Sequence, residues 1–296
     1  MNYTIKALLT GIQTYNGHFF KLHNVPDMKL KIRAPIQVFL LQGENGKNIL
    51  VEAGCPGAIE GPMVWGAADQ PVPDGGGADG VRNALATVGL EIDDIDMLIL
   101  THLHLDAAWC IDIFNRAQII VQRNEFAYAL KPFGWQMALY SRRVILDLAA
   151  RKKPQNLRPL NGDTELGDGL SVLLTPGHTP ATQTVIVQTA RGKVAITPSG
   201  PTYANWFPAN PRFGFPLGFL ADTYNPCQNY TQPPLQYIGE MRRIARAADI
   251  ILPVYEPGIP KVIPDQWWFL PPEKNDARVK EFQQTGAFSP GLYLAE

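Results

Sequence analysis

Two histidines and a carboxylate lie close together in residues 101–107 (Thr-His-Leu-His-Leu-Asp-Ala), and side chains of these types bind metal ions. The preceding apolar residues, 95–100, have the length and composition of a buried strand. Residues two apart on an extended segment point to the same side, so His102 and His104 can converge on one ion. Asp106 follows two residues later, within reach of the same place.

A third histidine, His178, lies in a turn at residues 175–180 (Thr-Pro-Gly-His-Thr-Pro). Three imidazoles that leave one position open to water make a catalytic zinc site. Each histidine taken alone could instead be a strand-end side chain satisfied by hydrogen bonds. The combination of a His-x-His-x-Asp segment with a distant Gly-His turn favours the metal site over that alternative.

Composition excludes several classes of partner. The 26 Lys and Arg against 27 Asp and Glu give a formal net charge of -1, so nothing indicates nucleic acid or an anionic membrane surface. Only 3 cysteines occur, widely spaced, which argues against a disulfide framework. No apolar run approaches the roughly 18 residues of a membrane span, and the first residues lack a signal-peptide core. We therefore expect a soluble, cytoplasmic protein with a small-molecule substrate; a homodimer is left open.

The elements that must position the histidines are mainly strands. Strand patterns are predicted at 3–10, 35–42, 48–52, 94–100, 118–122, 169–175, 184–188, 193–197 and 249–253, and helices at 80–88, 125–130, 136–150 and 234–247. Turn signals typical of hairpins outnumber regular βαβ units, which favours a β-sandwich with helices outside. Residues 1–296 are predicted to form a single α+β domain. It carries an insert loop at 56–77 and an aromatic, proline-rich segment at 198–234.

These motifs and their order resemble the metallo-β-lactamase superfamily, and most of all its acyl-homoserine-lactone lactonase branch. The resemblance runs from about residue 35 to about residue 258 and is densest at 98–106, 119–125 and 175–180. It implies a four-layered αβ/βα sandwich with two mixed sheets, helices on the outer faces and the metal site at one edge.

The chain departs from the family where a second metal would bind. The family usually continues its motif as His-x-His-x-Asp-His, with a bridging Asp and a last His after later strands. Here Ala107 ends the motif, Ser199 stands near the place of the bridging Asp, and Tyr255 near that of the last His. Because all the losses fall on one metal, we expect a mononuclear site held by the three remaining histidines.

On a hydrolytic mechanism, a metal-bound hydroxide would attack a carbonyl carbon. Asp106 is then a candidate for base, leaving-group acid or fourth ligand, or for a partner that fixes a histidine tautomer. Glu256 is a second acid/base candidate, and Tyr255 could polarise a carbonyl. Substrate-pocket candidates are Trp65, Ser199, Tyr203, Trp206 and Phe207, although core packing would serve the aromatic ones equally well.

The predicted function is a metal-dependent hydrolase that opens a cyclic or activated carbonyl (lactone, ester or amide) of a hydrophobic or aromatic small molecule. The expected cofactor is one divalent ion, Zn²⁺ in the first place, with iron or manganese as alternatives. Two other hypotheses remain. One is iron-dependent or other non-hydrolytic chemistry on an aromatic or heterocyclic compound. The other is a catalytically silent, metal-containing binding protein.

Overall fold

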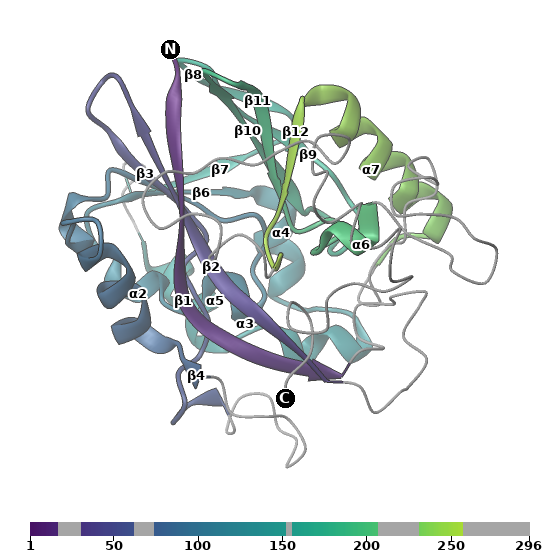
Figure 1. The fold of residues 1–296 in the computed structure, drawn as a ribbon. Helices are drawn as coiled ribbons and strands as arrows, with labels where there is room; N and C mark the ends of the chain where they lie inside the picture. The colour runs from purple at the N-terminus through teal and green to yellow at the C-terminus, as the bar shows by residue number, and fades with distance from the viewer. Residues whose placement is uncertain (17–30, 62–73, 152–155, 207–230, 257–296) are drawn as a thin grey trace.

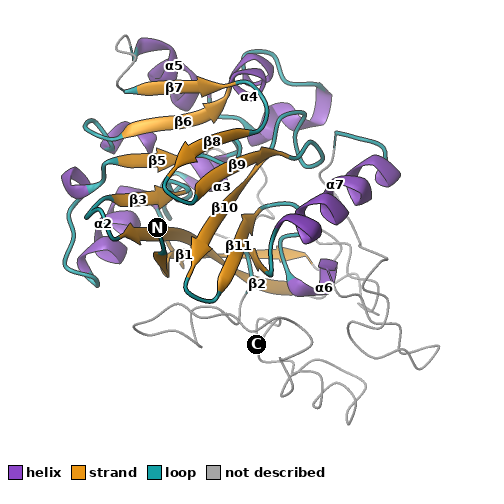
Figure 2. Ribbon diagram, turned by 90° about the horizontal axis from the view of Figure 1, so that it is seen from above, coloured by secondary structure: helices purple, strands orange, loops and turns teal. Residues whose placement is uncertain are grey.

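The computed structural model describes residues 1–16, 31–61, 74–151, 156–206 and 231–256. Two sheets pack face to face, with helices on their outer sides (Figures 1 and 2). This agrees with the expected α+β sandwich. No helix in the described ranges is long and apolar enough to cross a membrane.

Within these ranges the first sheet has seven strands, in the order β4-β1-β2-β3-β5-β6-β7. They are β1 (Tyr3–Asn16), β2 (Lys31–Gly43), β3 (Asn48–Val51), β4 (Asp74–Gly75), β5 (Met97–Ile99), β6 (Gln118–Gln122) and β7 (Leu157–Leu160). β1 to β3 form an antiparallel meander, whereas β3, β5, β6 and β7 run parallel to one another. The expectation that hairpins would predominate over βαβ units therefore fails for this half of the sheet.

The second sheet, again counted over the described residues, has five strands in the order β12-β11-β10-β9-β8. They are β8 (Thr164–Gly167), β9 (Leu170–Leu174), β10 (Gln183–Thr189), β11 (Gly192–Thr197) and β12 (Ile250–Pro253). Only β11 and β12 pair in parallel, so both sheets are mixed.

The helices cover the outer faces, as Figure 2 shows. They are α2 (Gly77–Ala86), α3 (Leu105–Ala108), α4 (Arg123–Ala129), α5 (Arg142–Ala150), α6 (Tyr203–Trp206) and α7 (Pro234–Ala247), with 3₁₀ turns η2 (Ile92–Asp94), η3 (Ile111–Ile113) and η4 (Gly134–Leu139). The helix predicted over 136–150 is wrong at its first part, since the chain is extended at Tyr140 between η4 and α5. β7 and β8 were not predicted.

Alternation along β2 shows how the layers form. Val38 and Leu40 pack in a cluster with the helix residues Val81 and Leu148, whereas Phe39 faces the second sheet. Successive side chains of a strand point to opposite faces, so an unbroken apolar run is what a strand covered on both sides requires. A third cluster seats α6 and α7 on the outer face of the second sheet; it contains Ile186, Ala195, Trp206, Tyr237, Met241, Ile244 and Ile251. The order is thus helices, sheet, sheet, helices.

Candidate metal centre

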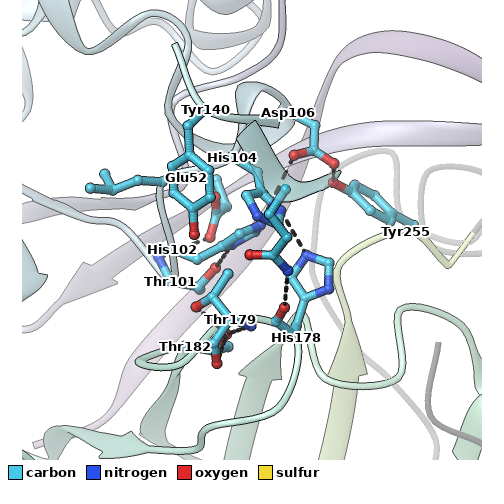
Figure 3. A network of polar contacts seen from close by, with 12 residues as sticks. Glu52, Thr101, His102, His104, Asp106, Tyr140, His178, Thr179, Thr182 and Tyr255 are labelled. Atoms are coloured by element: carbon cyan, nitrogen blue, oxygen red, sulfur yellow. Dashed lines mark hydrogen bonds and ion pairs between the residues drawn. The ribbon is translucent and has the colours of Figure 1, made fainter. Parts of the chain in front are cut away.

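The histidines lie at one edge of the sandwich, where strands of both sheets end (Figure 3). His102 and His104 follow β5 in the first sheet, and His178 lies in the turn between β9 and β10 in the second. Tyr255 follows β12, which enters the same edge beside β11. Loops anchored on two rigid sheets thus bring together residues far apart in sequence.

The three histidines form one compact cluster. Each offers a ring nitrogen, and these nitrogens lie within 4.8 Å of one another, the only such group of potential metal ligands among the described residues. His104 Nδ1 and His178 Nε2 are 3.0 Å apart. His102 places its ring 4.6 Å from that of His104 and 4.7 Å from that of His178, measured between centroids.

The chemistry of this donor set fits a divalent metal ion. Burial, and then the neighbouring histidines, lower the pKa of His102 and of His104 well below the ordinary value, so both imidazoles are neutral, the form that binds metal. His102 Nδ1 lies 2.9 Å from Thr101 Oγ1, while its Nε2 is buried without a hydrogen-bond partner in the described part of the chain. A buried nitrogen without a partner is costly, and a bound ion would satisfy it.

Asp106 and Tyr255 form a pair beside the cluster. The Tyr255 hydroxyl donates a hydrogen bond to Asp106 Oδ2, and Asp106 Oδ1 lies 4.0 Å from His102 Nε2. Burial raises the pKa of Asp106 and the bond from Tyr255 opposes that shift. The Asp106 side chain keeps 16% of its surface exposed, so it borders the site from the solvent side.

Glu52 supports His102 indirectly, through Thr101. It follows β3 with a φ of 71°, a conformation uncommon outside glycine, and its Oε1 accepts a hydrogen bond of 3.1 Å from the Thr101 backbone N–H. Burial raises the pKa of Glu52 to about 8, and the bonds from Thr101 oppose this. Glu52 thus fixes the residue whose hydroxyl contacts His102.

Glu125 of α4 lies between the two ligand-bearing segments. It is fully buried and accepts hydrogen bonds from the backbone N–H of Leu103, the hydroxyl of Tyr140 and the hydroxyl of Thr179. Burial raises the pKa of Glu125, and the bonds from Thr179, Leu103 and Tyr140 lower it in turn. The Tyr140 ring also packs edge-on against the His104 ring, 4.7 Å between centroids.

Two buried glutamines join the sheets below the histidines. Gln183, the first residue of β10, donates from its backbone N–H to Thr101 O at 2.8 Å and from Nε2 to Leu100 O at 2.7 Å. Gln122, the last residue of β6, donates to Gln183 Oε1 at 2.9 Å. The loop that carries His102 is therefore bonded directly to the second sheet.

The turn that carries His178 is held from both sides. Gln136 Nε2 donates to His178 O at 3.1 Å, and the Thr231 N–H donates to Gly177 O at 2.7 Å. A Cβ on Gly177 would lie 2.3 Å from a ring carbon of Tyr237, so only glycine allows this approach to α7.

Besides Tyr255, two other positions were expected to lack second-metal ligands, Ala107 and Ser199. Ala107 is buried in α3, and its carbonyl accepts a hydrogen bond of 2.6 Å from the Ala53 N–H. Ser199 is buried just after β11, with no hydrogen-bond partner for its hydroxyl in the described ranges. No described residue adds a carboxylate or histidine to the cluster of His102, His104 and His178.

The remaining candidates are more dispersed. Trp206 is buried beneath α7 and donates from Nε1 to Gly200 O at 2.6 Å, so its indole packs in the core. Tyr203 begins α6, and its side chain is not described. Trp65 and Phe207 lie outside the described residues. Glu256 is 1% exposed, and its carbonyl accepts a hydrogen bond from Gln37 Nε2 at 3.4 Å.

Sequence reasoning missed the residues that support the ligands: Glu52, Glu125, Gln136 and Gln183. Their partners are 15 or more residues away, as for Glu125 with Tyr140, so no local pattern reveals them. For Glu52 and Gln183 the available signal was a carboxylate or amide at the end of a strand.

Comparison with known proteins connects this site to a family. The model described as "Metallo-beta-lactamase superfamily" matches residues 33–197, more than half of the chain. N-acyl homoserine lactonase AiiA of Bacillus thuringiensis subsp. kurstaki is 33% identical over 174 residues, which cover 56% of this chain and 64% of that protein. The matched region thus spans less than two thirds of the relative's length.

Solved structures share the fold over most of the chain. A structure of N-acyl homoserine lactone hydrolase, with the product N-hexanoyl-L-homoserine bound at its catalytic metal centre, has a TM-score of 0.67 at 23% identity and covers 89% of this chain and 97% of its own. A mutant of B. thuringiensis AiiA with N-decanoyl-L-homoserine at the active site has a TM-score of 0.66 at 24% identity, with the same coverage. At these identities the likeness concerns the fold.

Proposed function

Because the chain belongs to the metallo-beta-lactamase superfamily, we propose that it is a metal-dependent hydrolase of the lactonase type. The observation that carries the proposal is the cluster of three histidine nitrogens within 4.8 Å, at the edge where both sheets end. His102, His104 and His178 would hold the ion, with Zn²⁺ expected and iron or manganese as alternatives.

We further propose that the site is mononuclear. The support is chemical: Ala107 has no side chain that could bind a metal, and Ser199 and Tyr255 offer neutral hydroxyl groups where the family usually has a carboxylate and an imidazole. At the place of the second ion, Asp106 would be the only charged ligand. One carboxylate is too little to offset the hydration that the ion would lose on binding. The space beside Asp106 is proposed to receive the substrate.

A bound divalent ion would lower the pKa of a water molecule to about 7 and would offset the negative charge that develops on a carbonyl oxygen. The chain's own residues then handle protons and orientation. Asp106 is proposed to accept a proton from the attacking water and return it to the leaving alkoxide, with Tyr255 holding the carboxylate in place. Glu256, buried one residue further on, is the second candidate for this proton transfer.

The proposed substrate is a lactone with an apolar substituent, and N-acyl homoserine lactones are the first compounds to test. Support comes from the relatives, which are named as lactonases of that class, and from solved structures with the product N-hexanoyl-L-homoserine in one and N-decanoyl-L-homoserine in the other. The Ser199 hydroxyl, buried and without a described partner, is proposed to bond a polar group of the substrate. Trp65, Tyr203 and Phe207 are the other proposed pocket residues, whereas the indole of Trp206 packs in the core.

The test combines metal analysis with turnover. We expect one zinc per chain. We also expect hydrolysis of N-hexanoyl- and N-decanoyl-homoserine lactone, measured through the acid that ring opening releases, and no activity in His104→Ala. Thr189→Ala is the matched control, because it removes a partly buried hydrogen bond to Gly192 at the distant end of β10. Two ions per chain would overturn the mononuclear proposal. Bound iron would favour non-hydrolytic chemistry, and bound metal without turnover of any lactone, ester or amide would favour a binding protein.

A further inference from the structure

One buried carboxylate contacts the immediate neighbours of all three histidines. Glu125 Oε1 accepts from the N–H of Leu103, at 3.1 Å, and Leu103 stands between His102 and His104. Glu125 Oε2 accepts from Thr179 Oγ1 at 2.5 Å, and Thr179 follows His178. The carboxylate thus spans the gap between the segment from the first sheet and the turn from the second.

The same carboxylate also orients a ring that contacts a ligand. Tyr140 donates its hydroxyl to Glu125 Oε1 at 3.0 Å, and its ring packs at 81° against that of His104. Reaching this position interrupts the helical pattern, since Tyr140 is extended and forms an isolated bridge with His104. The chain leaves the helical conformation where Tyr140 contacts His104, which indicates that this contact helps to place His104.

From this geometry we propose that Glu125 is a positioning residue, which sets the separation between the His102–His104 pair and His178 and thereby the affinity of the trio for a metal ion. The inference rests on the proposed metal-dependent function. Glu125 acts on the three rings through its bonds to Leu103, Tyr140 and Thr179. Outer-shell partners of this kind typically contribute about 10- to 100-fold to metal affinity.

Glutamine has nearly the same shape as glutamate, but its side chain offers different hydrogen-bonding groups. An ionised carboxylate only accepts hydrogen bonds, and Glu125 receives three: from the Leu103 backbone N–H and from the Tyr140 and Thr179 hydroxyls. A glutamine has one oxygen left and presents an NH₂ donor instead of the other. One or two of the three donors then lose their acceptor, depending on which oxygen is replaced, and the ligand segments are expected to shift.

The test measures metal binding directly, without substrate. Glu125→Gln is expected to bind Zn²⁺ about 10- to 100-fold more weakly than the wild type. Its Co²⁺ form is expected to show an altered visible spectrum, because that spectrum reports ligand geometry. Tyr140→Phe, which leaves the other bonds to Glu125, should cause a smaller loss of affinity. Glu165→Gln makes the same substitution at an exposed position of β8 and should change neither quantity.

The variant Ile5→Val separates a general loss of stability from an effect on ligand position. It removes one carbon from the core between the two sheets, at a residue far along the chain from every histidine ligand. It should lower the melting temperature and leave Zn²⁺ affinity and the Co²⁺ spectrum unchanged. Wild-type affinity and spectrum in Glu125→Gln, or equal losses in Ile5→Val, would overturn the inference. One bound ion with no lactone turnover in the wild type would overturn the proposed function alone, and a wild type that binds no ion would overturn both.

Discussion

Replacing Gly177 by alanine should disturb the site through a single steric contact. The added Cβ would lie 2.3, 2.6 and 2.9 Å from three carbons of the Tyr237 ring. Ordinary contact between carbons needs about 3.5 Å, so the turn or the ring must shift by about 1 Å. The ring is fully buried, and its hydroxyl accepts a hydrogen bond from the Gly200 N–H at 3.3 Å, so it cannot swing into solvent.

Overpacking of this kind typically costs about 1–3 kcal/mol of the free energy of unfolding. Because His178 is the next residue, a displaced turn should also weaken metal binding. Urea denaturation and Zn²⁺ titration of Gly177→Ala would measure the two effects. Gly239→Ala is the matched control: it lies in α7, where a Cβ would meet nothing within 4 Å, and alanine there should be neutral or stabilising by up to about 1 kcal/mol.

A second change at Tyr237 tests the cause. Tyr237→Leu removes the ring that the new Cβ would meet, so in the double variant the cost of Gly177→Ala should largely disappear, although Tyr237→Leu is destabilising by itself. The difference between the two costs is the coupling energy of a double-mutant cycle. If Gly177→Ala is as stable as the wild type, or costs the same with and without the ring, the steric explanation is refuted.

Three further predictions concern the ion, the Asp106–Tyr255 pair beside it, and Cys110. Chelation should lower the melting temperature and added Zn²⁺ should restore it, because an ion at 1,000 times its Kd stabilises the folded state by about 4 kcal/mol; a melting temperature insensitive to both would contradict a metal site. Tyr255→Phe should reduce lactone turnover while leaving Zn²⁺ affinity nearly unchanged, since its hydroxyl bonds the Asp106 carboxylate, which is proposed to transfer a proton and not to hold the ion; unchanged turnover would remove Tyr255 from the mechanism. Burial raises the pKa of Cys110 to about 12, so iodoacetamide at pH 8 should leave it unlabelled in the folded protein and label it after denaturation, as followed by mass spectrometry.

The strands of the core were predictable because their chemistry is local. The apolar residues 35–42 lie within β2, and the Ile-Ile-Val run at 119–121 lies within β6. β7 was missed because Leu157–Leu160 is short, polar in part and contains Pro159; a proline is tolerated there because β7 lies at the edge of the sheet. Parallel pairing, as between β5 and β6, depends on partners that no local pattern names.

The residues of the site were likewise predictable only where the signal is local in the sequence. The convergence of His102, His104 and His178 was predictable from their spacing and from the resemblance to a family, since ligand types and turns are visible in the sequence. The break at Tyr140 was not, because the helical spacing of its neighbours is overridden by a long-range bond to Glu125 and a ring contact with His104. Tertiary contacts of this kind routinely prevail over local propensity.

The glutamine pair beneath the histidines has a consequence for how the two sheets are aligned. An apolar interface is non-directional, so it resists separation of the layers better than it resists small sliding of one layer along the other. The hydrogen bonds from the Gln183 side-chain amide to Leu100 O, at 2.7 Å, and from the Gln122 amide to Gln183, at 2.9 Å, are directional. They lie at the edge where sliding of the sheets would move the histidines apart. The alignment of the layers is therefore fixed by polar contacts, and the core can vary in volume without changing the distance between histidines of opposite sheets.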